Sequence, residues 1–187
     1  MMRIFLILLA FTLSTQGYSQ AKIAGHILPK VMKVGDQYLK LNGGGVREKM
    51  FIDLYIAILY LEAPTTKAND ILTVDKPMAI KLKIVSSMVD KDNFEAALRD
   101  GFKKSTNNNV APYKDRIEKL ISAGFKEEIT DLDIYDLIYQ PGIGTTLMKN
   151  NKKLVTIEGL DFKDALFGIW LGTAPAQVDL KKKMLGE

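Results

Sequence analysis

The stretch that most constrains the fold is a run of twelve mostly apolar residues from Met50 to Leu61, MFIDLYIAILYL. At the two-residue period of a β-strand, side chains at even positions share one face and those at odd positions share the other. Both sets are mostly apolar, and Asp53 is the only charged residue of the run. A strand that is apolar on both faces lies between two layers of structure. We therefore expect this strand to form the centre of the core.

A polar, glycine-rich segment leads into this strand. Gly43, Gly44 and Gly45 follow one another and precede Arg47. Consecutive glycines in a strand pattern indicate a bulge, a kink in a twisted sheet, or a place where another group approaches the backbone closely. They do not form a phosphate-binding loop, because no Gly-Lys-Ser/Thr follows them.

Arg47, Asp53 and Tyr55 are the polar residues beside the apolar run and the first candidates for a functional site. On one straight strand, the eight positions between Arg47 and Tyr55 would separate them by about 26 Å. A turn at Glu48-Lys49 would instead place both side chains on one cavity. We therefore predict a hairpin with its turn at Glu48-Lys49.

The rest of the chain alternates between strand and helix patterns. Consecutive strand patterns separated by short turns, such as Asn150-Asn151, predict antiparallel pairing, and grouped helices predict a layer on one face of the sheet. We expect an α+β fold in which Asp161 caps a C-terminal helix and Pro175 begins the last one. The expected strands cover 21–34, 37–41, 78–85, 133–140, 144–149 and 153–158, and the expected helices cover 66–72, about 90–104, 112–124, 161–172 and the segment from 175.

The N-terminus has the features of a secretory signal peptide. Arg3 supplies the basic start, Ile4 to Leu13 form the apolar stretch, and Gly17 and Ser19 put small residues at −3 and −1 of a cleavage site before Gln20. This apolar stretch is too short to span about 30 Å of hydrocarbon. We expect it to be removed rather than kept as an anchor.

The predicted domains are a signal peptide at 1–19 and one folded domain at 20–187. The mature protein is then periplasmic or secreted, with no stable membrane span after processing. Its formal charge falls from +4 to +3, because 1–19 contains one basic residue and no acidic one.

Composition excludes several kinds of site. The chain has no cysteine, so it has no disulfide, thiolate metal site or cysteine nucleophile. Its single histidine, His26, rules out a multi-histidine metal site, and we expect it at the surface. The lysines do not alternate with aromatic residues, so nucleic-acid binding is not indicated. We predict no metal and no cofactor.

Two separated segments resemble the chalcone isomerase superfamily. The first, LNGGGVREKMFIDLYIAILYLEAP, is similar to its Gly-x-Gly-x-Arg strand and the aromatic-rich strand ending in Tyr-Leu. The second, IEGLDFKDALFGIWLGTAPAQVDLKKKMLG, resembles the terminal helices of the small bacterial branch called chalcone isomerase-like, and QPGIGTT fits a hairpin between them. This resemblance implies an open-faced β-sandwich: a large antiparallel sheet, a helical layer on one face, and a ligand cleft between them.

The catalytic residues of the plant isomerases match only in part. In those enzymes an arginine on the glycine-rich strand stabilises the oxyanion, while a threonine and a tyrosine hold a water network. Arg47 occupies the arginine position, and Tyr55 stands at the threonine position. No tyrosine occurs between Leu61 and Pro112, and Ile169 aligns with another threonine. Apart from Arg47, the catalytic polar set is largely missing.

Arg47 with Tyr55 resembles instead the fatty-acid-binding branch of the superfamily, where an arginine and a tyrosine hold a carboxylate at the end of an apolar tunnel. A guanidinium can grip a carboxylate bidentately, and a tyrosine hydroxyl adds a neutral donor. Each buried CH₂ of the chain contributes about 0.8 kcal/mol. We therefore predict a non-catalytic binder of a fatty acid or similar apolar carboxylate, with Arg47 and Tyr55 as the ligand-binding residues.

Other interpretations remain open at this point. Arg47 can pair with Glu48 or Asp53 at the sheet surface, and Tyr55 can be a core tyrosine. The protein can also be an isomerase or lyase of an enone, with Arg47 as the electrophilic stabiliser and Tyr55 as a proton donor. Finally, it can be an exported interaction module with a vestigial cleft.

These interpretations predict different clefts. An open apolar tunnel facing Arg47 favours the binder, and a polar pocket with ordered water favours the enzyme. A cleft filled by Phe51, Leu59 or Trp170 favours the interaction module.

Overall fold

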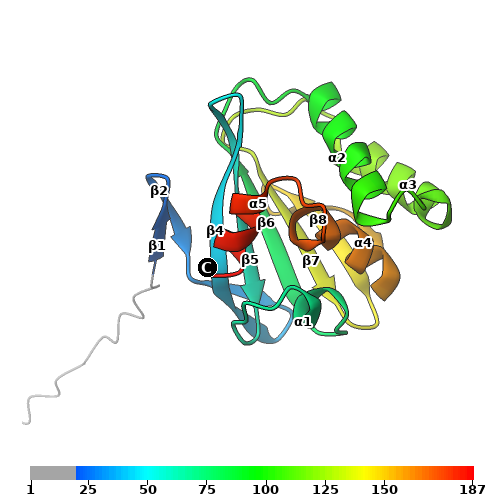
Figure 1. Ribbon diagram of the computed structural model, residues 1–187, viewed down its shortest axis with the longest axis horizontal. Helices are drawn as coiled ribbons and strands as arrows, with labels where there is room; N and C mark the ends of the chain where they lie inside the picture. Colours follow the sequence, from blue (N-terminus) through cyan, green and yellow to red (C-terminus); the bar gives the residue numbers. More distant parts are fainter. Residues whose placement is uncertain (1–19) are drawn as a thin grey trace, which may run out of the picture.

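The computed structural model describes residues 20–187, so the predicted signal peptide lies outside the described part of the chain. Seven strands form one sheet in the order β3-β4-β5-β6-β7-β8-β9, and β1 and β2 form a separate hairpin (Figure 1). The strands are β1 (Gln20–Ile23), β2 (His26–Pro29), β3 (Val31–Val34), β4 (Gln37–Lys49), β5 (Ile52–Leu61), β6 (Met78–Ile84), β7 (Ile134–Gln140), β8 (Gly144–Lys149) and β9 (Lys152–Ile157). The helices are α1 (Asn69–Leu72), α2 (Lys91–Ser105), α3 (Lys114–Gly124), α4 (Leu160–Leu171) and α5 (Val178–Met184), with a 3-10 turn η1 (Ala111–Tyr113) before α3.

Every pair of neighbouring strands in the large sheet is antiparallel, and the α-helices cover one of its faces (Figure 1). The predicted α+β class and the open-faced sandwich are confirmed. The opening segment at 21–34 differs in detail, because it divides into three strands rather than one. None of the helices within residues 20–187 is long and apolar enough to cross a bilayer.

The central strand β5 is buried on both faces, as its pattern predicts. Ala57 and Leu59 belong to the core beneath the helices. Ile56 and Ile58 belong to a second core that β2, β3 and β4 cover from the other side. All four side chains are 0% exposed.

The glycine segment of β4 combines two of its expected features. The register between β4 and β5 shifts between Leu41 and Gly43, which places a bulge at Asn42. The C-terminal helix α5 then packs directly on the strand, and a Cβ at Gly43 would overlap the carbonyl oxygens of Lys183 and Met184. Glycine is therefore needed here for close approach of two backbones.

The turn of the β4–β5 hairpin lies two residues later than predicted. β4 runs through Lys49, and the turn residues are Met50 and Phe51, whose φ angles are 50° and 64°. A two-residue hairpin turn of this kind favours Asn and Gly, so this Met-Phe pair gives no turn signal. The prediction of a turn at Glu48-Lys49 is wrong for that reason.

Two helix starts are also corrected. Gly159, with a φ of 106°, precedes α4, whereas Asp161 lies in the first turn and accepts hydrogen bonds from Arg116 at 2.9 and 2.6 Å. Only glycine adopts such a φ readily, which explains why it precedes the helix. The last helix begins at Val178, not at Pro175.

Replacing Gly43 with alanine tests the contact between β4 and α5. We expect Gly43→Ala to lower the free energy of unfolding by about 2 kcal/mol or more, because backbone atoms must move to admit the methyl group. Urea denaturation measures this change. Gly142→Ala is the control: that glycine has a φ of 73° and no atom within 4 Å of an added Cβ, so strain alone should cost about 1–2 kcal/mol. A smaller loss in Gly43→Ala than in Gly142→Ala would contradict the packing described.

Candidate ligand-binding cleft

A cleft of about 630 Å³ lies between the hairpin end of β4 and β5 on one side and α2 and α4 on the other. Its mouth reaches solvent, because Met50 and Met88 line it and are 82% and 63% exposed. Its volume lies within the usual range of small-molecule sites. Apolar side chains dominate the deeper wall, among them Leu54, Val89, Phe94, Leu98, Ile169 and Trp170.

The structure brings Arg47 and Tyr55 together in this cleft. They are direct cross-strand partners in the β4–β5 register, and both line the cleft. The hairpin that was predicted to join them therefore does so, although its turn lies elsewhere. Asp53 is opposite Glu48 in the same register and is exposed, and it does not line the cleft.

Tyr55 is buried, and within residues 20–187 its hydroxyl accepts one hydrogen bond and donates none. Trp170 Nε1 donates to the Tyr55 oxygen at 3.1 Å. Burial raises the pKa of Tyr55, while the Trp170 hydrogen bond and the positive charge of Arg47 lower it by less. The phenol is therefore neutral at physiological pH. No acceptor for its proton is found among residues 20–187, so this O–H can donate to a ligand.

Arg47 is half-buried and held in place by oxygens that carry no charge. One terminal nitrogen donates to the Glu48 carbonyl at 2.5 Å and to Gln177 Oε1 at 3.1 Å. The ion pairs formed within the described residues do not include Arg47, so it pairs with neither Glu48 nor Asp53. The surface ion pair considered from the sequence is therefore not formed. The guanidinium lies instead close enough to Tyr55 to lower the pKa of its hydroxyl.

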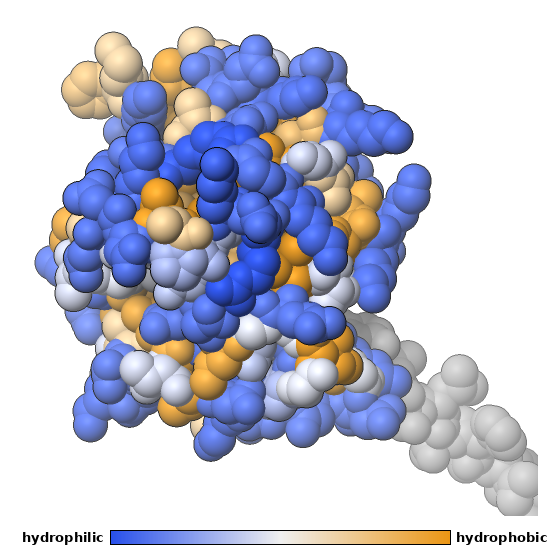
Figure 2. Space-filling model, turned by 90° about the vertical axis from the view of Figure 1, so that its right-hand side faces the viewer, coloured by the Kyte–Doolittle hydropathy of each residue, from blue (hydrophilic) through white to orange (hydrophobic). Residues whose placement is uncertain are grey.

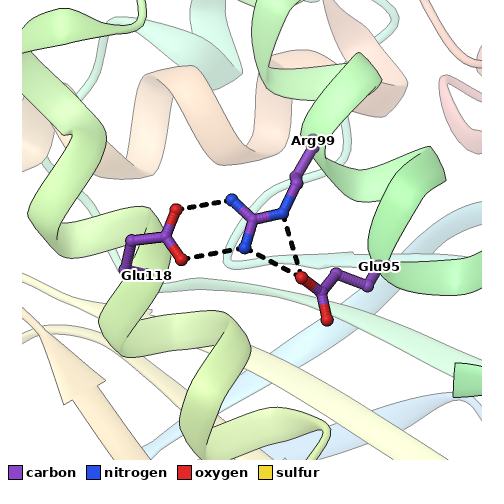
Figure 3. A network of polar contacts seen from close by, with 3 residues as sticks. All are labelled: Glu95, Arg99 and Glu118. Atoms are coloured by element: carbon purple, nitrogen blue, oxygen red, sulfur yellow. Dashed lines mark hydrogen bonds and ion pairs between the residues drawn. The ribbon is translucent and has the colours of Figure 1, made fainter. Parts of the chain in front are cut away.

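The outer wall of the cleft, α2, is fixed in two ways. Its N-cap is Asp90, which accepts a hydrogen bond from the Asn93 backbone N–H at 2.8 Å. Further along, Arg99 donates to Glu95 of α2 at 2.8 and 3.0 Å and to Glu118 of α3 at 2.5 and 2.8 Å (Figure 3). These contacts lower the pKa of Glu118 and raise that of Arg99, so both groups stay charged. The network locks α2 to α3 and keeps the cleft wall in position.

The outer surface of the helical side contrasts with the cleft. Hydrophilic side chains cover most of it, and hydrophobic residues appear in smaller patches between them (Figure 2). The face shown in Figure 2 is thus mostly hydrophilic, whereas the lining of the cleft is mostly apolar.

Phe51, Leu59 and Trp170, which could have filled the cleft, do not do so. Phe51 is 96% exposed at the hairpin tip, and Leu59 is fully buried in the main core. Trp170 lies in the cleft wall, where it binds Tyr55. Neither Phe51 nor Leu59 lines the cleft, which leaves it open to a ligand.

The single histidine lies away from the cleft. His26 is half-buried at the start of β2, where it pairs with Ile23, and it does not line the cleft. Within residues 20–187, no group of three or more metal-ligating side chains is close enough to hold a metal ion.

Two contacts of the site were not predicted from the sequence: the hydrogen bond of Trp170, which was considered only as a residue that could fill the cleft, and that of Gln177. Trp170 is 115 residues from Tyr55, and Gln177 is 130 residues from Arg47. Both contacts form because α4 and the segment that follows it in the chain pack against the β4–β5 hairpin. No local pattern indicates such contacts.

The family described as chalcone isomerase-like matches residues 20–186. The chain belongs to the chalcone isomerase-like family. This confirms the family predicted from the glycine-rich strand and the terminal helices. The narrower prediction of an exported bacterial branch stays a prediction.

Solved structures confirm the fold. A fatty-acid binding protein of Arabidopsis thaliana superimposes with a TM-score of 0.70 at 16% identity, over 89% of this chain and 96% of that chain. At this identity the similarity concerns the fold alone. None of the curated proteins matches the sequence.

The Trp170–Tyr55 hydrogen bond can be tested by removing the acceptor. We expect Tyr55→Phe to lower the free energy of unfolding by about 1–3 kcal/mol, because a buried indole N–H loses its partner. Tyr38→Phe is the control, since Tyr38 is 64% exposed, and it should change the stability by less than about 0.5 kcal/mol. Equal stability of the two variants in urea denaturation would contradict the role given to this hydrogen bond.

Proposed function

We propose that this chalcone isomerase-like protein binds a fatty acid or a similar apolar carboxylate in the cleft, without catalysing a reaction on it. The observation that carries the proposal is the polarity of the Arg47–Tyr55 pair. Arg47 offers only donors, and the neutral Tyr55 hydroxyl, which accepts from Trp170, still has its own proton to donate. Such a pair needs an acceptor, and a carboxylate provides two oxygens and a negative charge.

The cleft wall supports an apolar tail on this carboxylate. Leu54, Phe94 and Leu98 line it from β5 and α2. Ile169 lines it from α4, at the position where the resemblance to plant isomerases puts a threonine. An apolar side chain at this position can contact a hydrocarbon chain but cannot hydrogen-bond to a water network. This favours the binder over the enone isomerase.

The proposal also includes export of the protein from the cytoplasm. The predicted signal peptide at 1–19 would place the protein in the periplasm or outside the cell. There a carrier that shields an apolar chain from water has a physical use, because each CH₂ left in water costs about 0.8 kcal/mol relative to burial.

The charge of Arg47 can be tested directly. We expect Arg47→Ala to weaken binding of a long-chain fatty acid about tenfold to a hundredfold, since one hydrogen bond to a charged group contributes about 1.5–3 kcal/mol. Titration calorimetry measures the affinity. Lys40→Ala is the control, because Lys40 is an exposed basic residue of the same strand outside the cleft.

A matched ligand makes this test sharper. The methyl ester of the same fatty acid lacks the negative charge, so Arg47→Ala should change its binding much less than that of the acid. Native mass spectrometry with lipid extraction of protein purified from its own host should also show an apolar acid that Arg47→Ala loses. A folded wild-type protein that binds no acid in either experiment would overturn the proposed function.

The cleft itself can be blocked. Ala97 lies on the cleft side of α2 and is exposed, so a tryptophan there can extend into the cleft without displacing core atoms. We expect Ala97→Trp to weaken fatty-acid binding at least about tenfold, because one large side chain takes the space of several CH₂ groups, while the melting temperature stays unchanged.

The control for this variant is Ser122→Trp on α3, which is exposed and does not line the cleft. It should bind the acid as the wild type does. If both tryptophan variants bind normally, the acid binds elsewhere on the protein.

A further inference from the structure

Three large apolar side chains gather in solvent at the mouth of the cleft. Met50 and Phe51 form the tip of the β4–β5 hairpin and are 82% and 96% exposed. Met88, in the loop between β6 and α2, is 63% exposed and lines the cleft with Met50. We call these three residues the mouth cluster.

The hairpin and the loop run side by side at this end of the molecule. The backbone N–H of Val85, where the loop begins, donates to the Leu54 carbonyl of β5 at 3.1 Å. Both segments project at the same end of the sheet (Figure 1). The mouth cluster therefore lies at one end of the molecule, where Met50 and Met88 also line the cleft.

The hairpin tip carries residues that its backbone disfavours. The β8–β9 hairpin has the same two-residue turn, with φ angles of 50° and 66°, and it uses Asn150 and Asn151. The β4–β5 hairpin adopts φ angles of 50° and 64° with Met50 and Phe51 instead. Bulky side chains are uncommon at such angles, and side chains that are 82% and 96% exposed gain little burial in compensation. Strain of this kind, kept at the mouth of a cleft, points to a role in binding.

The charges beside the tip cancel. Arg47 and Lys49 are basic, whereas Glu48 and Asp53 are acidic. An anionic macromolecule would therefore gain little electrostatic attraction here, and an apolar partner fits better. A lipid bilayer is such a partner, and it is also where a water-insoluble acid resides.

We infer that the mouth cluster docks the protein on a lipid bilayer, so that the apolar carboxylate passes between the membrane and the cleft. This inference rests on the proposed function. Its geometry is suitable, because Arg47 and Tyr55 form the third residue pair behind the turn, about 10 Å from the tip. Surface-bound apolar elements enter a membrane by about 5–10 Å. The pair would then sit at the level of the lipid headgroups, where the carboxylate of a membrane-bound acid also lies.

The test uses flotation of the mature protein with phosphatidylcholine vesicles. We expect the wild-type protein to float with the vesicles at both low and high salt, because the contact is apolar. Phe51→Gly should weaken its partitioning about tenfold, as expected for the loss of one large apolar side chain. Glycine also suits the turn, so Phe51→Gly should be at least as stable as the wild type. Failure of the wild-type protein to float would overturn the inference.

Two further variants keep the test specific. Phe51→Trp should float like the wild type, and the emission of the new tryptophan should shift to the blue on adding vesicles, as measured against the Trp170 background. Ile143→Asn removes another apolar side chain, 48% exposed between β7 and β8 and outside the cleft lining, and it should float normally. Equal loss of flotation in Ile143→Asn and Phe51→Gly would show that the protein adsorbs to vesicles non-specifically through any exposed apolar side chain, and it would overturn the inference.

A vesicle-free binding assay separates this inference from the proposed function. A fluorescent fatty acid should bind the wild type and Phe51→Gly equally in buffer, because Phe51 does not line the cleft. Binding in buffer without flotation would overturn membrane docking alone. Flotation without binding in buffer would support docking and overturn the proposed function.

Discussion

The burial of β5 on both faces is the constraint on which the rest of the structure depends. Its fully buried aliphatic side chains each contribute about 1.5–3 kcal/mol only if both faces are covered. The helices α2, α3 and α4 cover one face, and the N-terminal strands cover the other. Because β5 is fixed from both sides, its partner β4 is fixed in register, and Arg47 is held opposite Tyr55.

The candidate site lies where this buried strand leaves the core. From Ile56 onwards β5 is fully enclosed, whereas Leu54 and Ile52 are only partly buried and face the cleft. Arg47 and Tyr55 therefore lie next to the buried, rigid part of β5 and beside the cleft. This arrangement suits binding, because groups held in place before the ligand arrives lose little entropy when it binds. On the opposite wall, the hydrogen bonds of Arg99 to Glu95 and Glu118 hold α2 in place in the same way (Figure 3).

The parts of the structure that could be predicted are those with a local signal. The two-residue period predicted the doubly buried strand from Ile52 to Leu61, but it wrongly included Met50 and Phe51, which form the exposed turn. The glycines of β4 indicated the bulge and the close contact. The turn at Met50-Phe51 was missed because its residues are not turn residues, whereas Asn150-Asn151 was correctly predicted. The Trp170 and Gln177 contacts could not be predicted, since they connect segments more than a hundred residues apart. The roles of Arg47 and Tyr55 in binding stay predictions.

The same interactions that hold Arg47 and Tyr55 in place leave the positive charge of Arg47 without a carboxylate partner among residues 20–187. Gln177 and the Glu48 carbonyl orient Arg47 through neutral oxygens, and Trp170 occupies the acceptor position of Tyr55. A carboxylate side chain in this place would have satisfied the guanidinium internally, and a ligand would first have had to displace it. Neutral partners hold the geometry without cancelling the charge. The fold thus holds a donor pair that has no internal counter-ion among the described residues. Under the proposed function, a bound carboxylate would supply the missing negative charge and form charge-assisted hydrogen bonds with it.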